Sequence, residues 1–177
     1  DDTLTTHMKS VGEAMSLGRN FTEALNKALR SIEDSNAPFD FAGPIDRTVD
    51  ELLESIKRPH EYRTQEIVLA LRAGALKEQI YQATAIDPWF LDQFELLVDI
   101  AKTLAEAPDL TPELLRLAKR HGFSDSQIAK IRHLATDVVR ALRWSLGIRP
   151  VFKTVDTCAG RFGSQTSYLY SSYDEET

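Results

Sequence analysis

Helix start and stop signals recur along most of this chain, and they limit it to a fold built from short helices. Asp87 followed by Pro88 is a start signal, because the Asp side chain can accept a hydrogen bond from the first turn and proline fits the first helical position. Thr111 and Pro112 repeat this pattern, and a capping-box pattern begins at Ser124. Apolar residues follow each signal at spacings of three and four, the period of an amphipathic helix. We therefore predict helices near residues 21–32, 49–56, 60–72, 76–84, 88–104, 112–121, 125–131 and 136–146.

The two ends of the chain differ from this helical centre. Residues 8–15 mix β-branched and apolar residues with a glycine, so they can hold a strand and a turn. Gly147 ends the last predicted helix, and the residues after it are extended in pattern, with Tyr168 and Tyr170 alternating near the end of the chain. Residues 36–44 carry two prolines and a glycine, which is typical of a linker. The predicted fold is all-α: a compact multi-helix domain of short helices, with short extended segments at the N- and C-terminal ends.

Composition excludes several classes of protein. The chain is 42% hydrophobic and 27% charged, as in ordinary globular domains. Its net charge of −6 gives no overall attraction to nucleic acid or acidic lipid. No apolar run approaches the roughly 18 residues that span a bilayer, so we expect no membrane contact. Cys158 is the single cysteine, which excludes an internal disulfide and fits a reducing, cytoplasmic location.

Motifs for chemistry are missing from the sequence. There is no phosphate-binding loop of the G-x-x-x-x-G-K-[ST] type, no G-x-G-x-x-G and no G-x-S-x-G nucleophile elbow. The histidines do not occur at paired metal-ligand spacing; they are His7, His60, His121 and His133. We predict that this chain contributes no catalytic, cofactor-binding or metal-binding residue.

The segment 123–144 allows an alternative interpretation, because it has the pattern of a helix-turn-helix. Its second helix carries Arg140 and Arg143, whose side chains would reach base edges in a DNA major groove. From Arg116 to Arg143 the chain has seven Lys or Arg against two Asp, an excess that favours contact with an anion. However, the turn between the helices lacks the usual glycine, and the second helix begins with the acidic Asp137. We therefore prefer a basic face that docks on an acidic neighbouring domain, and keep a nucleic-acid-binding module as the alternative.

Two blocks near the ends of the chain resemble one known family. The sequence G-I-R-P-V-F-K-T-V-D-T-C-A at 147–159, followed by T-S-Y-L-Y-S-S-Y at 166–173, resembles the link between the two halves of the carbamoyl-phosphate synthase large subunit. The sequence M-K-S-V-G-E-A-M at 8–15, followed by G-R-N-F-T-E-A-L-N-K-A-L-R-S at 18–31, resembles the end of the first ATP-grasp unit of that family. The D-P-W-F-L at 87–91 matches its helical domain more loosely. The two specific blocks lie at opposite ends and in the right order, which strengthens the resemblance.

The resemblance implies three parts and a larger parent enzyme. Residues 1–36 would close the first, carboxyphosphate ATP-grasp unit, 37–150 would form the helical oligomerisation domain, and 151–177 would lead into the second, carbamoyl-phosphate half. The parent would be an ATP-dependent ligase that makes carbamoyl phosphate from bicarbonate, ATP and glutamine-derived ammonia for arginine and pyrimidine biosynthesis, with Mg²⁺ and K⁺ as further parent cofactors. The fragment alone is expected to be inactive and to bind no cofactor.

The resemblance also implies partners and surfaces for this chain. The implied partners are other copies of the large subunit, the flanking ATP-grasp halves and the glutaminase small subunit, with no nucleic acid and no membrane. The long apolar helix offers a candidate self-association surface, formed by Trp89, Phe90, Phe94 and Leu97. The closing tyrosines are candidates for packing against a neighbouring domain; they are Tyr168, Tyr170 and Tyr173.

Overall fold

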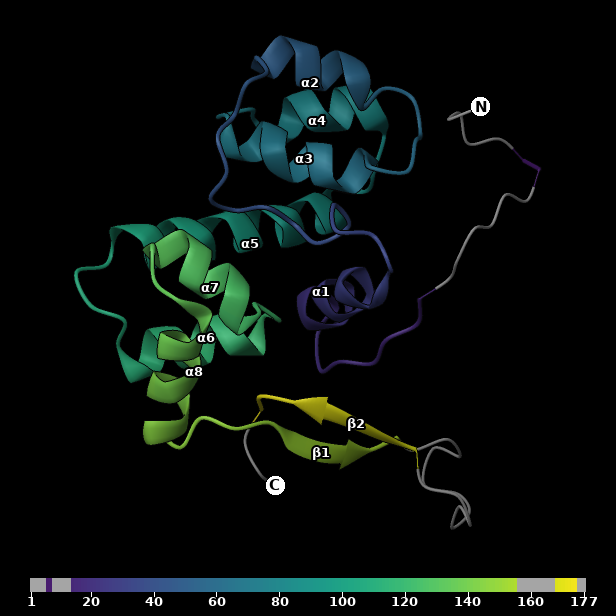
Figure 1. Cartoon of the computed structure of the whole chain (residues 1–177). Helices are drawn as coiled ribbons and strands as arrows, with labels where there is room; N and C mark the ends of the chain where they lie inside the picture. Colours follow the sequence, from purple (N-terminus) through teal and green to yellow (C-terminus); the bar gives the residue numbers. More distant parts are fainter. Residues whose placement is uncertain (1–5, 8–13, 156–167, 175–177) are drawn as a thin grey trace.

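The computed structural model describes residues 6–7, 14–155 and 168–174, and within them the chain is mainly helical (Figure 1). Its elements, in chain order, are α1 (Phe21–Ser31), α2 (Val49–Ser55), α3 (Arg63–Arg72), α4 (Lys77–Thr84), α5 (Pro88–Glu106), α6 (Pro112–Arg120), α7 (Asp125–Arg132), α8 (Thr136–Ser145), β1 (Val151–Thr154) and β2 (Leu169–Ser172). α5 has 19 residues, and the other helices have between 7 and 11. The prediction of an all-α domain of short helices is confirmed.

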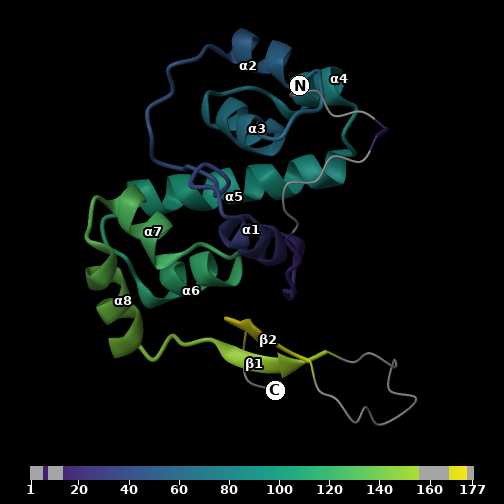
Figure 2. The same cartoon turned by 45° about the vertical axis from the view of Figure 1, so that its right-hand side comes forward.

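Helix α5 runs through the middle of the molecule and separates two groups of helices (Figures 1 and 2). On one side it packs against α3 and α4, and α2 contacts both of these. On the other side it packs against α6 and α7, and α8 packs on α7. α1 also lies against α5, and the two strands lie beyond α1, at the end of the molecule away from α2–α4 (Figure 1). Because α5 touches helices on opposite sides, much of its surface is inside the domain.

The apolar core receives buried side chains from each of these helices. α5 supplies the largest share, which consists of Leu91, Phe94, Leu97, Ile100, Ala101 and Leu104. α2 and α4 each contribute a fully buried residue to the core, Leu52 and Ile80 respectively. Full burial of one such side chain stabilises the fold by about 1.5–3 kcal/mol, so the stripes predicted from the sequence account for the packing of the helices.

The predicted helix signals act as the sequence suggested. At five of the described helix starts, a side-chain oxygen accepts a hydrogen bond from a backbone N–H of the first turn, whereas α3, α4 and α8 have no such side-chain cap. The capping residues are Asn20, Thr48, Asp87, Thr111 and Ser124. Glycines with positive φ follow three helices, where only glycine adopts this conformation without strain; they are Gly74, Gly122 and Gly147. After α7 the same left-handed conformation is taken by His133, with φ of 54°, where the sequence offered no glycine.

A few boundaries differ from the sequence-based expectation. α3 begins at Arg63 rather than near His60, because residues 61 and 62 form a turn before it. The extended segment expected at residues 8–15 lies mostly outside the described residues, and Ala14 and Met15 are in no strand.

The predicted linker at residues 36–44 is irregular, as expected, but it is packed onto the helices. Its Phe39 is 2% exposed and its Phe41 is 8% exposed. Arg72 donates hydrogen bonds to two carbonyl oxygens of the segment, at 2.8 and 2.7 Å. The side-chain amide of Gln127 donates to the Phe39 carbonyl at 3.0 Å. The segment is therefore part of the domain and holds its two phenylalanines in the core.

The predicted extended segments near the C-terminal end form a two-stranded antiparallel sheet, with Val151 opposite Ser172. One face of it turns toward α1, where the Ser172 hydroxyl donates to the Glu23 carboxylate at 3.2 Å. The other face carries Phe152, 73% exposed, and Leu169, 59% exposed. The sheet therefore has one packed face and one open apolar face.

Candidate functional site

The exposed start of α5 carries an aromatic cluster. Asp87 accepts a hydrogen bond from the Trp89 N–H at 2.9 Å, which fixes the first turn and directs the next side chains outward. Trp89 is 51% exposed and Phe90 is 41% exposed. Their rings contact Phe21 of α1 edge-to-face, with centroids 5.5 and 5.3 Å away. The cluster of Phe21, Trp89 and Phe90 thus stands at the surface, supported from behind by a second helix.

Only half of the predicted self-association residues reach this surface. Phe94 is 4% exposed and Leu97 is fully buried, so the structure corrects their assignment. Both face the core because α5 is covered on opposite sides by other helices. Phe94 packs against Phe21 and Phe39, at centroid distances of 6.5 and 6.1 Å. Most of the wide apolar stripe of α5 is therefore buried in the core, and its exposed large apolar residues are Trp89 and Phe90.

A small hollow of about 180 Å³ lies between α4 and the start of α5. It is lined by Lys77, Glu78, Tyr81, Gln82, Pro88, Leu91 and Asp92. At its edge the Lys77 ammonium forms ion pairs with Asp92 at 2.6 Å and Glu95 at 2.8 Å. The hydrogen bonds with these carboxylates raise the Lys77 pKa above its ordinary value. An apolar surface edged by charged pairs is the usual make-up of a protein–protein contact.

A second site lies inside the domain, where two cations share one carboxylate. The Lys119 ammonium is 2.9 Å from Asp125 Oδ1. Arg143 donates to the same carboxylate through Nε, at 3.1 and 3.2 Å, and through Nη2, at 2.9 Å. All three residues are at most 9% exposed. The Arg143 Nη1 also donates to the Ile148 carbonyl at 3.0 Å, so the cluster fixes the chain as it leaves α8.

The ring of Tyr173 covers this ion cluster. It lies 4.8 Å from the Lys119 ammonium and 5.5 Å from the Arg143 guanidinium carbon. Tyr170 has a similar contact, with its ring 5.7 Å from the Lys27 ammonium. Tyr168 is 63% exposed. Tyr173 and Tyr170 thus have partners within this chain and Tyr168 is the most exposed of the three, so packing of these tyrosines against a neighbouring domain stays a prediction.

Burial and charge pull the ionisation of this cluster in opposite directions. Burial raises the pKa of Asp125, but the hydrogen bonds from Arg143 and the nearby Lys119 charge outweigh it and keep the pKa below its usual value. Burial lowers the pKa of Lys119 to about 8, because the Asp125 charge offsets only part of the desolvation. Burial also raises the pKa of the Tyr173 hydroxyl. At neutral pH the cluster therefore holds an ionised Asp125 between two cations, with Lys119 the easier one to deprotonate.

This ionisation predicts how stability changes with pH. Folded Lys119 releases its proton near pH 8, while the unfolded chain keeps it up to the ordinary value of 10.5, so unfolding takes up a proton between these values. The free energy of unfolding of the wild type, relative to Lys119→Met, should therefore rise by about 1 kcal/mol or more between pH 8 and pH 10. Urea unfolding of both proteins across this range measures the difference. A constant difference would contradict the assignment.

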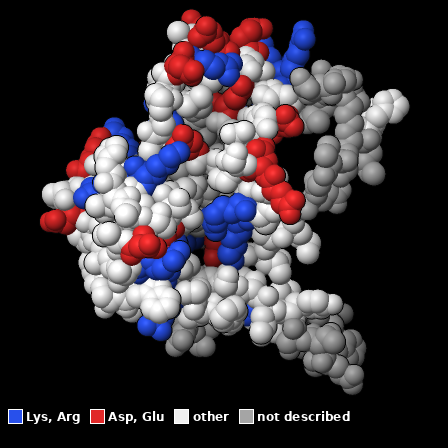
Figure 3. All heavy atoms as spheres, viewed as in Figure 1, with Lys and Arg blue, Asp and Glu red and all other residues white. Residues whose placement is uncertain are grey.

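The helix-turn-helix alternative does not fit this arrangement. Arg143, one of its two proposed base-reading residues, is buried against Asp125. Arg140 is exposed but lies 3.6 Å from Asp137 on its own helix. Arg132 donates to carbonyl oxygens at the end of α5, including that of Leu104 at 2.9 Å. Figure 3 shows acidic and basic side chains interspersed over α7 and α8 on this face, without a continuous basic surface.

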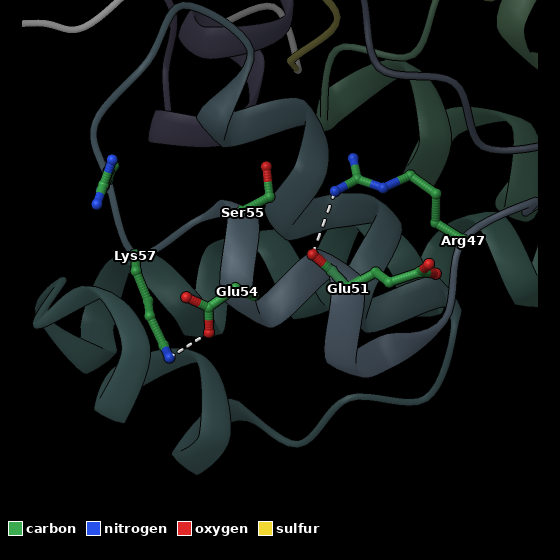
Figure 4. A pocket seen from close by; sticks show the side chains of 6 residues that line it. Arg47, Glu51, Glu54, Ser55 and Lys57 are labelled. Carbon is green, nitrogen blue, oxygen red and sulfur yellow. Dashed lines mark hydrogen bonds and ion pairs between the residues drawn. The ribbon is translucent and has the colours of Figure 1, made fainter.

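The largest hollow described lies beside α2, has a volume of about 740 Å³ and is wide open to solvent (Figure 4). Its lining is mainly charged: Arg47, Glu51, Glu54, Ser55, Lys57 and Arg58. Arg47 is paired with Glu66 at 2.6 Å and donates to the Glu51 carbonyl at 3.2 Å, and Lys57 is paired with Glu54. Arg47 and Lys57 are therefore paired with nearby carboxylates, and the labelled side chains do not converge on a common point (Figure 4). Within the described ranges, no group of three His, Cys, Asp or Glu is placed to hold a metal ion.

The sequence points to Trp89 and Phe90 as candidate surface residues, but not to Phe21 or to the cluster around Asp125. The pattern places Asp125 only at the start of α7 and its two cations in a basic segment. The sequence signal for the cluster is the excess of basic residues between Arg116 and Arg143. Cys158 lies outside the described residues. None of the helices that the structure describes has the length and apolar character needed to cross a bilayer.

Comparison with known proteins agrees with this architecture. Residues 13–147 match the family described as "Carbamoyl-phosphate synthetase large chain, oligomerisation domain". Three similar proteins, each named carbamoyl phosphate synthase large chain, come from Kineococcus radiotolerans (60% identical over 99% of this chain), Streptomyces avermitilis (58% over 100%) and Streptomyces coelicolor (57% over 100%). The chain spans 16% of the length of each of these relatives. The matched residues include all eight helices of the described part, and this chain belongs to the family of carbamoyl-phosphate synthetase large-chain oligomerisation domains.

Proposed function

We propose that this domain joins copies of the large chain through the surface formed by Phe21, Trp89 and Phe90. The single observation that carries the proposal is the exposure of two large aromatic residues on a rigid, capped helix start, 51% for Trp89 and 41% for Phe90. Aromatic residues dominate the energy of protein interfaces, and tryptophan is the most enriched of them. The family is described by its oligomerisation role, which favours a second copy of this chain as the occupant.

The geometry of the surface suits a two-fold contact. In a symmetric dimer the same patch meets itself, so an apolar centre with balanced charges at its edge is self-complementary. The cluster provides the apolar centre, and Lys77 with Asp92 and Glu95 provides charges of both signs beside it. The hollow between α4 and the start of α5, partly lined by Tyr81 and Leu91, gives room for a side chain of the second copy.

Sedimentation of the chain across a wide concentration range tests this proposal. The wild type should associate as concentration rises. Trp89→Glu should weaken association by at least about tenfold, because it places a charge where an aromatic anchor of roughly 2 kcal/mol is expected. Trp144→Glu is the matched control, since Trp144 is 54% exposed on α8, next to Arg149 and not in the cluster. A wild type that stays monomeric, or an equal effect of both substitutions, would overturn the proposal.

We further propose that the chain joins two catalytic parts of a longer polypeptide. Residues 1–36 would close the first, carboxyphosphate unit, 37–150 would form the spacer and assembly domain, and 151–177 would lead into the second, carbamoyl-phosphate half. The open face of the strand pair supports a partner there, because Phe152 and Leu169 are both more than half exposed, as is Tyr168 just before β2. An isolated two-stranded sheet is marginal in water, so further packing would stabilise it. The reading frame around this chain is the test: ATP-grasp motifs should lie on both sides.

The proposed parent activity is the synthesis of carbamoyl phosphate from bicarbonate, ATP and ammonia that a small subunit releases from glutamine, in the cytoplasm. Mg²⁺ and K⁺ would serve the parent outside this domain. What supports this proposal is that the similar proteins are named carbamoyl phosphate synthase large chain and that 99–100% of this chain aligns with them. The helical domain would act by placing the two halves and by assembly.

A further inference from the structure

Glu23 and Lys27 of α1 form an ion pair that meets two segments far apart in the sequence. The pair is one helical turn long, with 3.5 Å between the Lys27 ammonium and Glu23 Oε1. Glu23 is 1% exposed, although glutamate is rarely buried to this degree. A buried carboxylate has to be satisfied by hydrogen bonds or charges, so the folded chain requires the groups that bind Glu23. These partners come from the segment before α1 and from the strand β2.

Glu23 and Lys27 both bind the segment before α1, residues 14–20. The backbone N–H of Arg19 donates to Glu23 Oε2 at 2.7 Å. The Lys27 ammonium donates to the Leu17 carbonyl at 2.8 Å. Gly18 lies so close to α1 that an added Cβ would be 2.8 Å from the backbone nitrogen of residue 24. The segment therefore sits directly on the first turns of α1.

Strand β2 is held by the same two side chains. The Ser172 hydroxyl donates to Glu23 Oε2, the oxygen that also accepts from Arg19, at 3.2 Å. The Lys27 ammonium donates to the Ser171 carbonyl as well as to Leu17. Each side chain thus uses one head group to bind both segments, which are about 150 residues apart in sequence. An ion pair between Arg19 and a residue next to β2, Asp174, also joins the segments, at 3.0 Å.

We propose that the Glu23–Lys27 pair couples the segment before the helical domain to the strand after it, so that loosening either segment loosens the other. If one segment moves away, the buried carboxylate loses a donor and the ammonium loses an acceptor, and both head groups shift from the positions that bind the remaining segment. Such coupling is reciprocal by thermodynamic necessity. Its role between the two flanking halves rests on the proposed function, but the coupling itself is a property of this chain.

Amide hydrogen exchange on the whole chain tests the proposal in both directions. Gly18→Ala should displace the first segment and speed exchange of the β2 amides by about fivefold or more, the lower end of common coupling energies. Ser172→Ala, which adds no clash, should speed exchange of the Arg19 amide by a similar factor. In a Lys27→Met background, the coupling between the effects of Gly18→Ala and Ser172→Ala should become smaller, because one of the two shared head groups is gone while Glu23 remains.

Lys130→Met is the matched control, since Lys130 is a 66% exposed lysine paired with Asp40 on another surface. It should leave the coupling unchanged, and circular dichroism should show the same helix content in every variant. If Gly18→Ala costs helix content, the Ser172→Ala measurement at Arg19 decides alone. Purely local effects of Ser172→Ala, or a coupling that Lys27→Met leaves undiminished, would overturn the proposal. Neither result bears on the sedimentation test, so failure of the coupling and failure of the assembly proposal are distinguishable.

Discussion

Replacing Asp125 with alanine should lower the free energy of unfolding by about 3–5 kcal/mol, the usual cost of removing one partner of a buried ion pair. The reason is that Asp125 is the carboxylate partner of both Lys119 and Arg143, which are 6% and 7% exposed. Without it, two cations face each other in a desolvated site. Lys119 would relieve part of this by losing its proton, since burial already lowers its pKa to about 8. Urea unfolding followed by circular dichroism measures the loss.

The control for this prediction is Asp137→Ala. Asp137 also lies in the first turn of a helix and also faces an arginine, but its side chain is 91% exposed. Exposed ion pairs contribute little, so this variant should stay within about 0.5 kcal/mol of the wild type. Equal costs for the two alanine variants would show that the buried cluster has no special weight in the stability of the domain.

Phe123→Ala should cost about 3–5 kcal/mol, the range for a large aromatic residue removed from a packed core. Phe123 is 1% exposed and follows Gly122 in the turn between α6 and α7. Its ring stacks on Phe41 of the packed segment 36–44, with centroids 4.8 Å apart and planes at 29°. The substitution would therefore leave a cavity where the segment, α6 and α7 meet. Chemical denaturation of the purified variant gives the value.

Two further variants make this prediction specific. Phe41→Ala combined with Phe123→Ala should show a coupling energy of about 0.5–1.5 kcal/mol, as expected for two rings in contact. Phe152→Ala removes the same side chain at a position that is 73% exposed, and should change stability by no more than about 0.5 kcal/mol. A Phe123→Ala protein as stable as Phe152→Ala would disprove the role given to the stack.

The fold could be predicted in large part because its signals are local. A capping side chain such as Asp87 acts within one turn, and a glycine such as Gly122 ends a helix through its own backbone. The apolar period shows which stripe of a helix is buried, so the core residues of α5 were identifiable. The period does not show what covers the stripe. That is why Phe94 and Leu97 could not be separated from Trp89 and Phe90 before the positions of the other helices were known.

The sites were harder to predict because their contacts join distant residues. The charge pattern suggested a basic face, yet Arg143 turns inward to Asp125, 18 residues earlier. Glu23 is paired within its own helix, but its other partner, Ser172, is 149 residues away. The Tyr173 ring contacts Lys119 and Arg143, which lie 54 and 30 residues earlier in the chain. No spacing rule in the sequence connects such pairs.

The position of α1 also determines when the domain can finish folding during synthesis. Of the helices that the structure describes, α1 is synthesised first, but the Asn26 side-chain amide donates to the His121 carbonyl, 95 residues later, at 3.0 Å. At about 5–20 residues per second, that carbonyl is synthesised roughly 5–20 s after the helix. During this interval the Asn26 amide lacks the carbonyl that accepts its hydrogen bond. α1 can pack on α5 earlier, but its bond to the turn after α6 forms only once His121 has been made.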